Sequence, residues 1–514
     1  MKQYPSIFND VIGPVMIGNS SSHTAASVRI GNLIRQLAGA DIAEVHLKYD
    51  SNSSLASAHV SQFVDSAIMA GILGFATSDP QVCHGLELAD AAGIKYSFTV
   101  LDIEPGHPNT YYIFLTLADG RQMTMKALSI GGGMVQVIEY QGFSLLIEGG
   151  FHEVLVPCLS QDRENLYNEL CSSIPGDSDV RYLKNGEACL MQIRSEEPPD
   201  DRIKLLLPGE AVILTPGLPV KSQLDPDVPF LTGQEIISYC EKHNNLSLGE
   251  VAALYESSRS GETVEQVYQR MGEIINILRQ SLHQPPDAFF TDRILPNQAH
   301  LSQASSHILG GRHHQFILEH VTRFMDIKAS LGVIVAAPTA GACSCLPGVV
   351  FALGEELSLD DNQLVEAMLA AGLIGVLIAA HSTFAAELAG CQAECGAASG
   401  MAAAACAQIL GLSPQLCLAA ASMALQNVFG LTCDPVAMRV EVPCLGKNIM
   451  AAFNAVACAN MAAAGYAQVI PIDETIAAFD AAGRALPVEL RCTGLAGLSI
   501  TPTARDITAR LAGR

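Results

Sequence analysis

The residue pattern of this 514-residue chain changes near Phe230, and the two sides of that change call for different architectures. Before it, short apolar runs alternate with helical patterns. After it, long helical patterns carry alanine and glycine in place of bulky side chains, as in Met401 to Ala407 and Leu418 to Leu425. Small side chains let helices approach closely, which is typical of a compact helical core. We therefore expect the α+β class, with mixed α/β structure first and an all-α domain after it.

The first 150 residues alternate strand and helix patterns and are predicted to form one mixed α/β domain. The glycines at 131–133 mark a loop, and residues 65–73 form part of a helix. Strands are expected at 44–49, 96–101, 111–117 and 143–147.

Residues 151–222 show a weaker α/β pattern that ends in a proline-punctuated stretch. A strand (VLVPC), a helix (RENLYNELCSSI) and a strand (ACLMQIR) precede Pro208, Pro216 and Pro219. Two interpretations stay open, a small regulatory module and an elaborate connector. We expect three regions, 1–150, 151–222 and 223–514.

The balance of charge excludes several kinds of partner. The chain has 29 basic and 52 acidic side chains, a formal charge of −23, which disfavours nucleic acid and anionic membranes. The apolar stretch Leu364 to Ala380 contains Glu366, is short for a membrane span and lacks basic flanks, so we expect a buried helix. The N-terminus has no secretion-signal pattern. Together with 15 cysteines, this predicts a reducing, cytoplasmic location.

The cysteines are unevenly placed, because ten of the 15 lie between Cys343 and Cys492. Cys391, Cys433 and Cys444 stand beside glycine or proline, which break helices and expose the backbone around a thiolate. Their wide spacing does not match the paired cysteines of a structural zinc site. It is typical of cluster ligation where several helices meet.

The segments AGCQAECG, GLTCDPV and VPC, together with IGPVMIGNSSSHTAASVRIG, resemble the iron–sulfur-dependent L-serine dehydratases over nearly the whole chain. The chain looks like the β and α parts of that family, separate subunits in some members, fused into one polypeptide. The resemblance implies a cytoplasmic, homo-oligomeric (dimeric) enzyme that converts L-serine to pyruvate and ammonia, with 223–514 as the catalytic domain. It also implies a [4Fe–4S] cluster on Cys391, Cys433 and Cys444.

Three ligands leave one iron of such a cluster open. An open iron acts as a Lewis acid on the substrate hydroxyl, which makes a poor leaving group tolerable. The other buried cysteines of the helical half, Cys406, Cys417 and Cys458, are expected to be small core residues. Cys395 is also more consistent with packing.

The run Ser20 to Thr24 precedes an apolar periodic segment, which predicts a helix start with a hydroxyl side chain as N-cap. Capping alone accounts for the composition. A helix N-terminus with several hydroxyls is also a carboxylate cradle, and the resemblance implies that this loop lines the active site. We therefore expect Ser21, Ser22 and Thr24 to contact the substrate and His23 to transfer a proton.

Further contacts are expected from the helical half. Thr339 and Gly341, in the APTAG turn, could add donors to the site. Lys447 and Asn448 follow the last cluster cysteine, where the family tends to have a basic residue and asparagine. Lys447 could pair with the substrate carboxylate or balance the charge of the cluster.

The chain departs from the family pattern on the substrate side. The family segment Gly-His-Gly-Thr-Asp appears here as residues 61–65, so that Gln62 stands in place of the histidine. His59 could substitute as the catalytic residue. Met438 and Arg439 replace smaller or apolar residues, and Cys492 stands where relatives commonly have glutamate. These differences allow a related hydroxy-amino acid or hydroxy acid as substrate.

Two other functional classes remain possible at this stage. A pyridoxal-phosphate deaminase needs a Schiff-base lysine and a phosphate cup, and Lys242, Lys328 and Lys447 stand in no such motif, so we expect no pyridoxal phosphate. A sensor that retains a cluster without turnover is the other class.

Overall fold

The computed structural model describes residues 4–103, 106–159, 163–170, 174–175, 178–201, 203, 207, 210–243, 246–285 and 293–512. Its strands are β1 (Val15–Ile17), β2 (Ile42–Asp50), β3 (Lys95–Leu101), β4 (Thr110–Leu117), β5 (Gln122–Gly131), β6 (Met134–Tyr140), β7 (Phe143–Ile147), β8 (His152–Leu159), β9 (Asp179–Asn185), β10 (Ala188–Ser195), β11 (Val212–Leu214) and β12 (Val333–Val335). The first helices are α1 (Ala26–Ala38), α2 (Ser54–Ala58), α3 (Val64–Ile72), α4 (Gly85–Ala91) and α5 (Arg163–Leu170).

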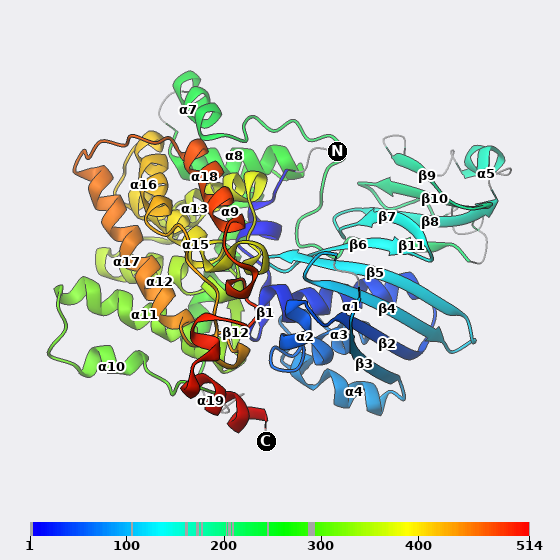
Figure 1. Cartoon of the computed structure of the whole chain (residues 1–514). Coiled ribbons are helices and arrows are strands. Elements are labelled where there is room, and N and C mark those ends of the chain that lie inside the picture. Colours follow the sequence, from blue (N-terminus) through cyan, green and yellow to red (C-terminus); the bar gives the residue numbers. More distant parts are fainter. Residues whose placement is uncertain are drawn as a thin grey trace.

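The later helices form the second half of the molecule (Figure 1). They are α7 (Gly233–Lys242), α8 (Leu248–Ser260), α9 (Val264–Leu282), α10 (Ala299–Ala304), α11 (Gly311–Ala329), α12 (Cys345–Leu357), α13 (Asp361–His381), α14 (Ala386–Ala389), α15 (Cys395–Ile409), α16 (Pro414–Gln426), α17 (Cys444–Ala463), α18 (Ile472–Arg484) and α19 (Pro502–Ala512). The predicted α+β class is confirmed.

The first sheet has six strands in the order β3-β2-β4-β5-β6-β7. β2 and β3 are parallel, and the other neighbours are antiparallel. Helices α1 and α3 pack together and bury their apolar side chains against this sheet, with Ile30, Ile34 and Ile68 in the shared core (Figure 1). The four strands predicted in this region are present. β5 and β6, which the sequence analysis did not predict, form a hairpin that turns at Gly132 and Gly133.

The second sheet is antiparallel, with the order β11-β8-β10-β9. Its strands β8 and β10 and its helix α5 correspond to the pattern that the sequence shows between residues 151 and 222. Its edge strand β9 lies beside β7 of the first sheet (Figure 1). Residues 150 and 222 both fall between elements, in the stretches that join β7 to β8 and β11 to α7.

The helical half is built around α13 and α15, which pack against each other. The alanines of α15 are buried, and this helix also contacts α16 and α17. Two segments, Ala340–Leu357 and Asp361–His381, are long and apolar enough to cross a membrane, and 78% of each window is buried inside the protein. Burial of this kind fits the core helix that the sequence predicted at 364–380.

An N-terminal arm ties the sheet region to the helices. A π-helical turn at Ile7–Val11 buries its apolar side chains in the helical core. Glu256 of α8 accepts hydrogen bonds from Ser6 Oγ and from the Ile7 amide, each 2.7 Å long. β1 then pairs antiparallel with β12, with Val15 opposite Val335. This arm brings the turn at 20–24 against the helical domain.

Candidate active site between the sheet and helical domains

The three predicted cluster cysteines lie at breaks between helices. Cys391 is in a 3₁₀ turn that follows α14, Cys433 is in the loop after α16, and Cys444 is the first residue of α17. Gly390 has a φ of +70°, which a residue with a side chain rarely adopts. Helix ends leave the backbone open around a side chain. Each of the three thiols therefore stands in a loop or at the end of a helix.

Cys391 and Cys433 meet, and the carboxylate of Glu394 joins them. One ligand atom from each of the three residues lies within 4.8 Å of the other two. Cys444 is outside this group of three, although its thiol is close enough for the charge of Cys391 to raise its pKa further. All three cysteines are buried.

The pKa values of the three thiols lie above the ordinary value for cysteine. A hydrogen bond with Cys433 and burial hold the pKa of Cys391 well above its usual value. Burial raises the pKa of Cys444 to about 12. A bound metal would stabilise the thiolates, because metal binding displaces the protons of its ligands.

Glu394 is a site residue that the sequence analysis missed. Thr339 Oγ1 donates to its Oε1 over 2.7 Å, and the Cys391 thiol lies 3.9 Å from its Oε2. Burial raises its pKa to about 7, although the hydrogen bond from Thr339 lowers it. A Cβ on Gly341 would lie 2.6 Å from Oε1, so this predicted site residue is needed as glycine to make room for the carboxyl group.

Two lysines flank the thiols, with different partners. Lys447 Nζ donates to the Thr432 carbonyl over 2.6 Å and to Asp434 Oδ1 over 3.0 Å. Lys328 is fully buried, and its ammonium donates to the Val440 carbonyl. Among the described residues, no carboxylate is within ion-pair distance of Lys328 Nζ. A buried cation without a counter-ion is costly, so this position calls for negative charge nearby.

Asn448 uses its amide to hold the segments around the thiols together. Its Nδ2 donates to the carbonyl oxygens of Gly341 and Cys444 over 2.8 and 2.9 Å, and its Oδ1 accepts from the Cys345 amide over 3.1 Å. These hydrogen bonds use the donors and the acceptor of the side-chain amide, which therefore holds the segments of Gly341, Cys345 and Cys444 together.

Backbone hydrogen bonds hold Cys492 next to Cys433. The Cys433 amide donates to the Leu490 carbonyl over 2.8 Å, and the Cys492 amide donates to the Cys433 carbonyl over 2.9 Å. The Cys492 thiol is also close enough to raise the pKa of Cys433. The C-terminal segment therefore covers the loop of Cys433.

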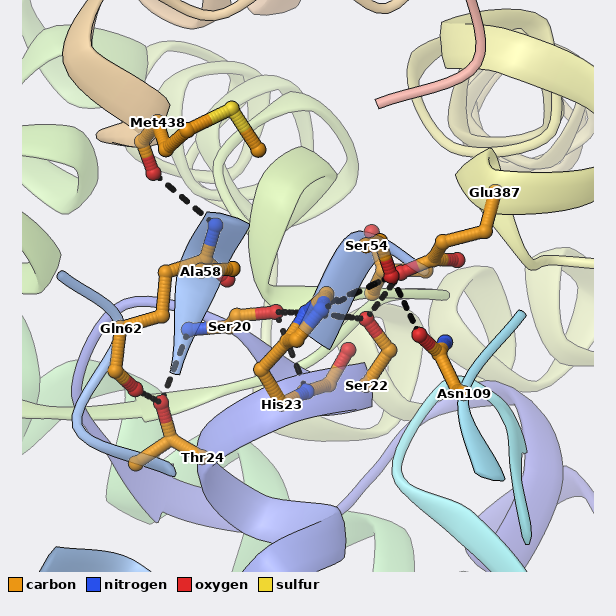
Figure 2. Close-up of polar contacts among 12 residues, drawn as sticks. Ser20, Ser22, His23, Thr24, Ser54, Ala58, Gln62, Asn109, Glu387 and Met438 are labelled. Atoms are coloured by element: carbon orange, nitrogen blue, oxygen red, sulfur yellow. Dashed lines mark hydrogen bonds and ion pairs between the residues drawn. The ribbon is translucent and has the colours of Figure 1, made fainter. Parts of the chain in front are cut away.

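The opposite wall of the site is the turn that starts α1 (Figure 2). Ser20 Oγ accepts from the His23 amide over 3.3 Å, which confirms the predicted serine cap, although a π-helical turn at Ser21–Ala25 precedes α1. Ser22 Oγ donates to Glu387 Oε1 over 2.9 Å. His23 Nδ1 lies 3.1 Å from both serine hydroxyls.

His23 and Glu387 form a buried pair. His23 Nδ1 is 3.6 Å from Glu387 Oε1, and His23 Nε2 is 3.3 Å from Ser54 Oγ, which in turn donates to Asn109. Burial lowers the pKa of His23, while the charge of Glu387 opposes that shift. The imidazole can therefore accept a proton at neutral pH. Glu387 Oε2 is buried and has no hydrogen-bond partner in the described part of the chain.

Ser21, Thr24 and Gln62 make contacts that hold the two walls together. Ser21 Oγ accepts from the Ala340 amide over 3.1 Å, and Thr24 Oγ1 donates to the Gln62 carbonyl over 2.8 Å. Gln62 Nε2 donates to the Met438 carbonyl over 2.9 Å, which links the segment after α2 to the loop of Cys433 (Figure 2). An amide cannot act as a base, so Gln62 has a positioning role here.

His59 belongs to a separate pair. Its Nδ1 lies 2.7 Å from Asp65 Oδ2, and the Tyr49 hydroxyl donates to Asp65 Oδ1 over 3.0 Å. Its ring packs on Tyr49 with a centroid distance of 5.3 Å. Its neighbour Ala58 shares an apolar cluster with Cys391 and Cys433. The structure thus puts His59 at the edge of the thiol region, outside the hydrogen bonds around His23.

This chain is similar to known proteins along most of its length. Residues 243–499 match the family model described as serine dehydratase alpha chain. L-serine dehydratase 1 of Escherichia coli (strain K12) is 26% identical over 508 residues, which cover 95% of this chain and 97% of that protein.

Two shorter relatives from Bacillus subtilis (strain 168) are also similar to this chain. Its probable L-serine dehydratase alpha chain is 34% identical over 281 residues, 53% of this chain and 92% of that protein. Its probable L-serine dehydratase beta chain is 33% identical over 214 residues, 39% of this chain and 91% of that protein. The chain thus combines similarity to both.

Proposed function

Because this chain belongs to the serine dehydratase family, and resembles both the alpha and the beta chains in one polypeptide, we propose that it converts L-serine to pyruvate and ammonia. It is then a lyase of the ammonia-lyase type. The observation that carries this proposal is the meeting of buried thiols with the His23–Glu387 pair at the junction of two domains.

The proposed cofactor is a [4Fe–4S] cluster on Cys391, Cys433 and Cys444. A donor set of soft thiols suits iron–sulfur chemistry, and the buried ammonium of Lys328 suits the negative charge of three thiolates. If Cys391, Cys433 and Cys444 hold such a cluster, the iron without a protein ligand would supply Lewis-acid chemistry to the substrate hydroxyl. Every cysteine that the structure describes is a free thiol, which supports a reducing, cytoplasmic location.

The remaining residues bind the substrate and move its proton. The turn at Ser20–Thr24 offers hydroxyls and a helix N-terminus to the carboxylate of serine. Glu387 Oε2 is placed to accept the substrate ammonium. His23 takes the proton from Cα, the electrons of that bond form the double bond between Cα and Cβ, and the hydroxyl group leaves Cβ as hydroxide. Glu387 Oε1 stabilises the imidazolium that results. The enamine that remains tautomerises and is hydrolysed by water to pyruvate and ammonia. Thr339 and Glu394 hold the turn that faces the thiols.

Anaerobic purification with reconstitution tests this proposal. We expect about four iron and four sulfide ions per chain and pyruvate release from L-serine in an assay coupled to lactate dehydrogenase. A fully loaded protein that releases no pyruvate from L-serine would overturn the substrate. Pyruvate release by metal-free protein with a Schiff-base absorption band would overturn the cofactor.

A further inference from the structure

One buried apolar cluster lies beside both walls of the candidate site. Its six members come from α2, α14, the thiol loops and the C-terminal segment: Ala58, Ala386, Cys391, Cys433, Met438 and Cys492. The alanines carry one methyl group each, and Met438 has the longest side chain of the six. Its volume therefore decides how much of the space beside the thiols is filled.

The backbone at Met438 has a conformation that residues with a side chain rarely adopt. Met438 ends a 3₁₀ turn at Val436–Met438, and its φ is +54°, next to a φ of +52° at Ala437. Glycine suits this left-handed region, whereas other residues are strained there. Such residues persist only where surrounding contacts hold them, and they cluster at functional sites.

Contacts from both halves of the molecule hold this turn. Gln62 Nε2, from the segment after α2, donates to the Met438 carbonyl over 2.9 Å (Figure 2). The buried ammonium of Lys328 in α11 donates to the Val440 carbonyl. These contacts fix the Met438 backbone, so the direction in which its side chain leaves the main chain is fixed as well.

The Met438 side chain is closely packed at its sulfur atom. The residue is 9% exposed, and a Cβ on Gly494 would lie 2.9 Å from Met438 Sδ. A residue with a side chain at position 494 would displace the sulfur. The Met438 side chain therefore packs against the C-terminal segment and shares its cluster with the thiols.

The same cluster borders the place that the substrate takes in the proposed function. Ala386 precedes Glu387, and Ala58 ends α2, whose first residue Ser54 has its Oγ 3.3 Å from His23 Nε2. The substrate ammonium is assigned to Glu387, its α-proton to His23, and its hydroxyl to the side of the thiols. The β-carbon carries that hydroxyl, so it lies beside the apolar cluster.

We propose that Met438 sets the size limit at the β-carbon of the substrate. A hydrogen atom at the variable position of this carbon, as in L-serine, is accepted. A methyl group there, as in L-threonine, is excluded by the Met438 side chain. This inference rests on the proposed function and names the residue that restricts its substrate.

The chemistry itself does not distinguish the two amino acids. With L-threonine, the α-proton again goes to His23, its electron pair forms the double bond between the α- and β-carbons, and hydroxide leaves the β-carbon. The enamine tautomerises, and water hydrolyses it to 2-oxobutanoate and ammonia. The additional methyl group is the difference between the substrates, so the space beside the β-carbon decides between them.

The test compares kcat/KM for L-threonine with kcat/KM for L-serine, from the ammonia released by anaerobically reconstituted protein. Met438→Ala shortens the side chain. Met438→Gly removes it and suits a φ of +54°, so this variant carries the test if the alanine variant loses iron. Met438→Leu keeps an apolar side chain of similar volume. Met423→Ala, at a buried methionine of α16 outside the cluster, is the matched control.

We expect the ratio of the two kcat/KM values to shift toward L-threonine by about tenfold or more in Met438→Ala and Met438→Gly, because one methyl group in an apolar pocket has an effect of this size. The ratio should stay at the wild-type value in Met438→Leu and Met423→Ala. Calorimetric titration of the same samples with L-threonine measures binding without turnover, and its Kd should fall in the two shortened variants only.

A shift in the ratio or in Kd that is confined to the two shortened variants supports the size limit. An unchanged ratio and an unchanged Kd in iron-loaded Met438→Gly would overturn it, and so would an equal shift in Met423→Ala. A loaded wild type that releases no ammonia from L-serine would contradict the proposed function alone, because the calorimetric comparison still tests the role of Met438.

Discussion

The two walls of the candidate active site are built in different ways. The thiol wall comes from one stretch of the helical half, residues 391–444, and its cysteines stand at breaks between helices. The polar wall is assembled from side chains of separate segments, because Ser22 and His23 reach Ser54 in one direction and Glu387 in another. Where the backbone positions a residue, a substitution nearby changes the site little. Where side-chain hydrogen bonds position it, one substitution can change which residues are in contact. Gln62, which we expect to stand where the family pattern has a histidine, is a candidate for such a change.

The largest effect is expected on the thiol wall. Cys433→Ala should remove the proposed cluster and lower pyruvate formation on the order of 10³-fold or more, because the open iron is lost with its ligand. Iron and sulfide analysis and visible absorption measure the loss. Cys417→Ala, at a buried cysteine of α16 away from the thiols, should retain both cluster and activity. Full activity in Cys433→Ala would remove this residue from the ligand set.

On the polar wall, Glu387→Gln should leave the cluster in place and lower kcat about 10²- to 10³-fold. The substitution keeps the shape of the side chain and removes the charge that stabilises protonated His23. Steady-state kinetics and iron content measured on the same sample separate the two walls. Glu355→Gln, at an exposed carboxylate, is the control. Loss of iron in Glu387→Gln would show that the walls are not independent.

The pH dependence of kcat/KM tests the polar wall separately from the thiol wall. The proposed base must be neutral, so kcat/KM should fall as pH decreases through the pKa of His23, which burial places below the ordinary 6.5. Glu387 raises that pKa, so Glu387→Gln should move the acid limb to still lower pH. Profiles of kcat/KM between about pH 5 and pH 8 check this order. An acid limb above pH 6.5 in the wild type would assign it to another group.

The smallest effect is expected where one hydrogen bond joins the walls. Gln62→Ala removes the contact with the Met438 carbonyl, which should lower the free energy of unfolding by about 0.5–1.5 kcal/mol and raise KM for L-serine a few-fold. Urea unfolding and initial rates measure the two quantities. Gln269→Ala, on the exposed face of α9, should change neither. An increase in activity in Gln62→Ala would contradict the positioning role.

The sequence predicts the thiol wall much better than the polar wall. Helix-breaking glycine and proline beside each cysteine are local features, so the three cysteines and the serine-capped start of α1 could be picked out directly. Glu387 lies 365 residues from Ser22, and nothing local to either one indicates that they meet. The roles of Lys328 and Glu394 at the site were not predicted for the same reason, because they depend on burial beside thiols from distant segments.

The fold shows the same division. Strands in which apolar and polar residues alternate between two turns, such as β2 and β4, were predicted. The β5–β6 hairpin was not, because only its glycine turn stood out. The small second sheet was predicted as a pattern, but the contact of its strand β9 with β7 of the first sheet depends on how separate regions pack.

The pairing of β1 with β12 has a consequence for how the chain is made. The arm that precedes α1 needs Val335 and Glu256 before it can dock, and these residues leave the ribosome long after it. At roughly 5–20 residues per second, the arm waits tens of seconds with Ile7, Phe8 and Val11 uncovered. The six-stranded sheet can form in that interval, so the arm is expected to be the last N-terminal segment to settle. During synthesis it is therefore a natural binding point for a chaperone that shields apolar segments.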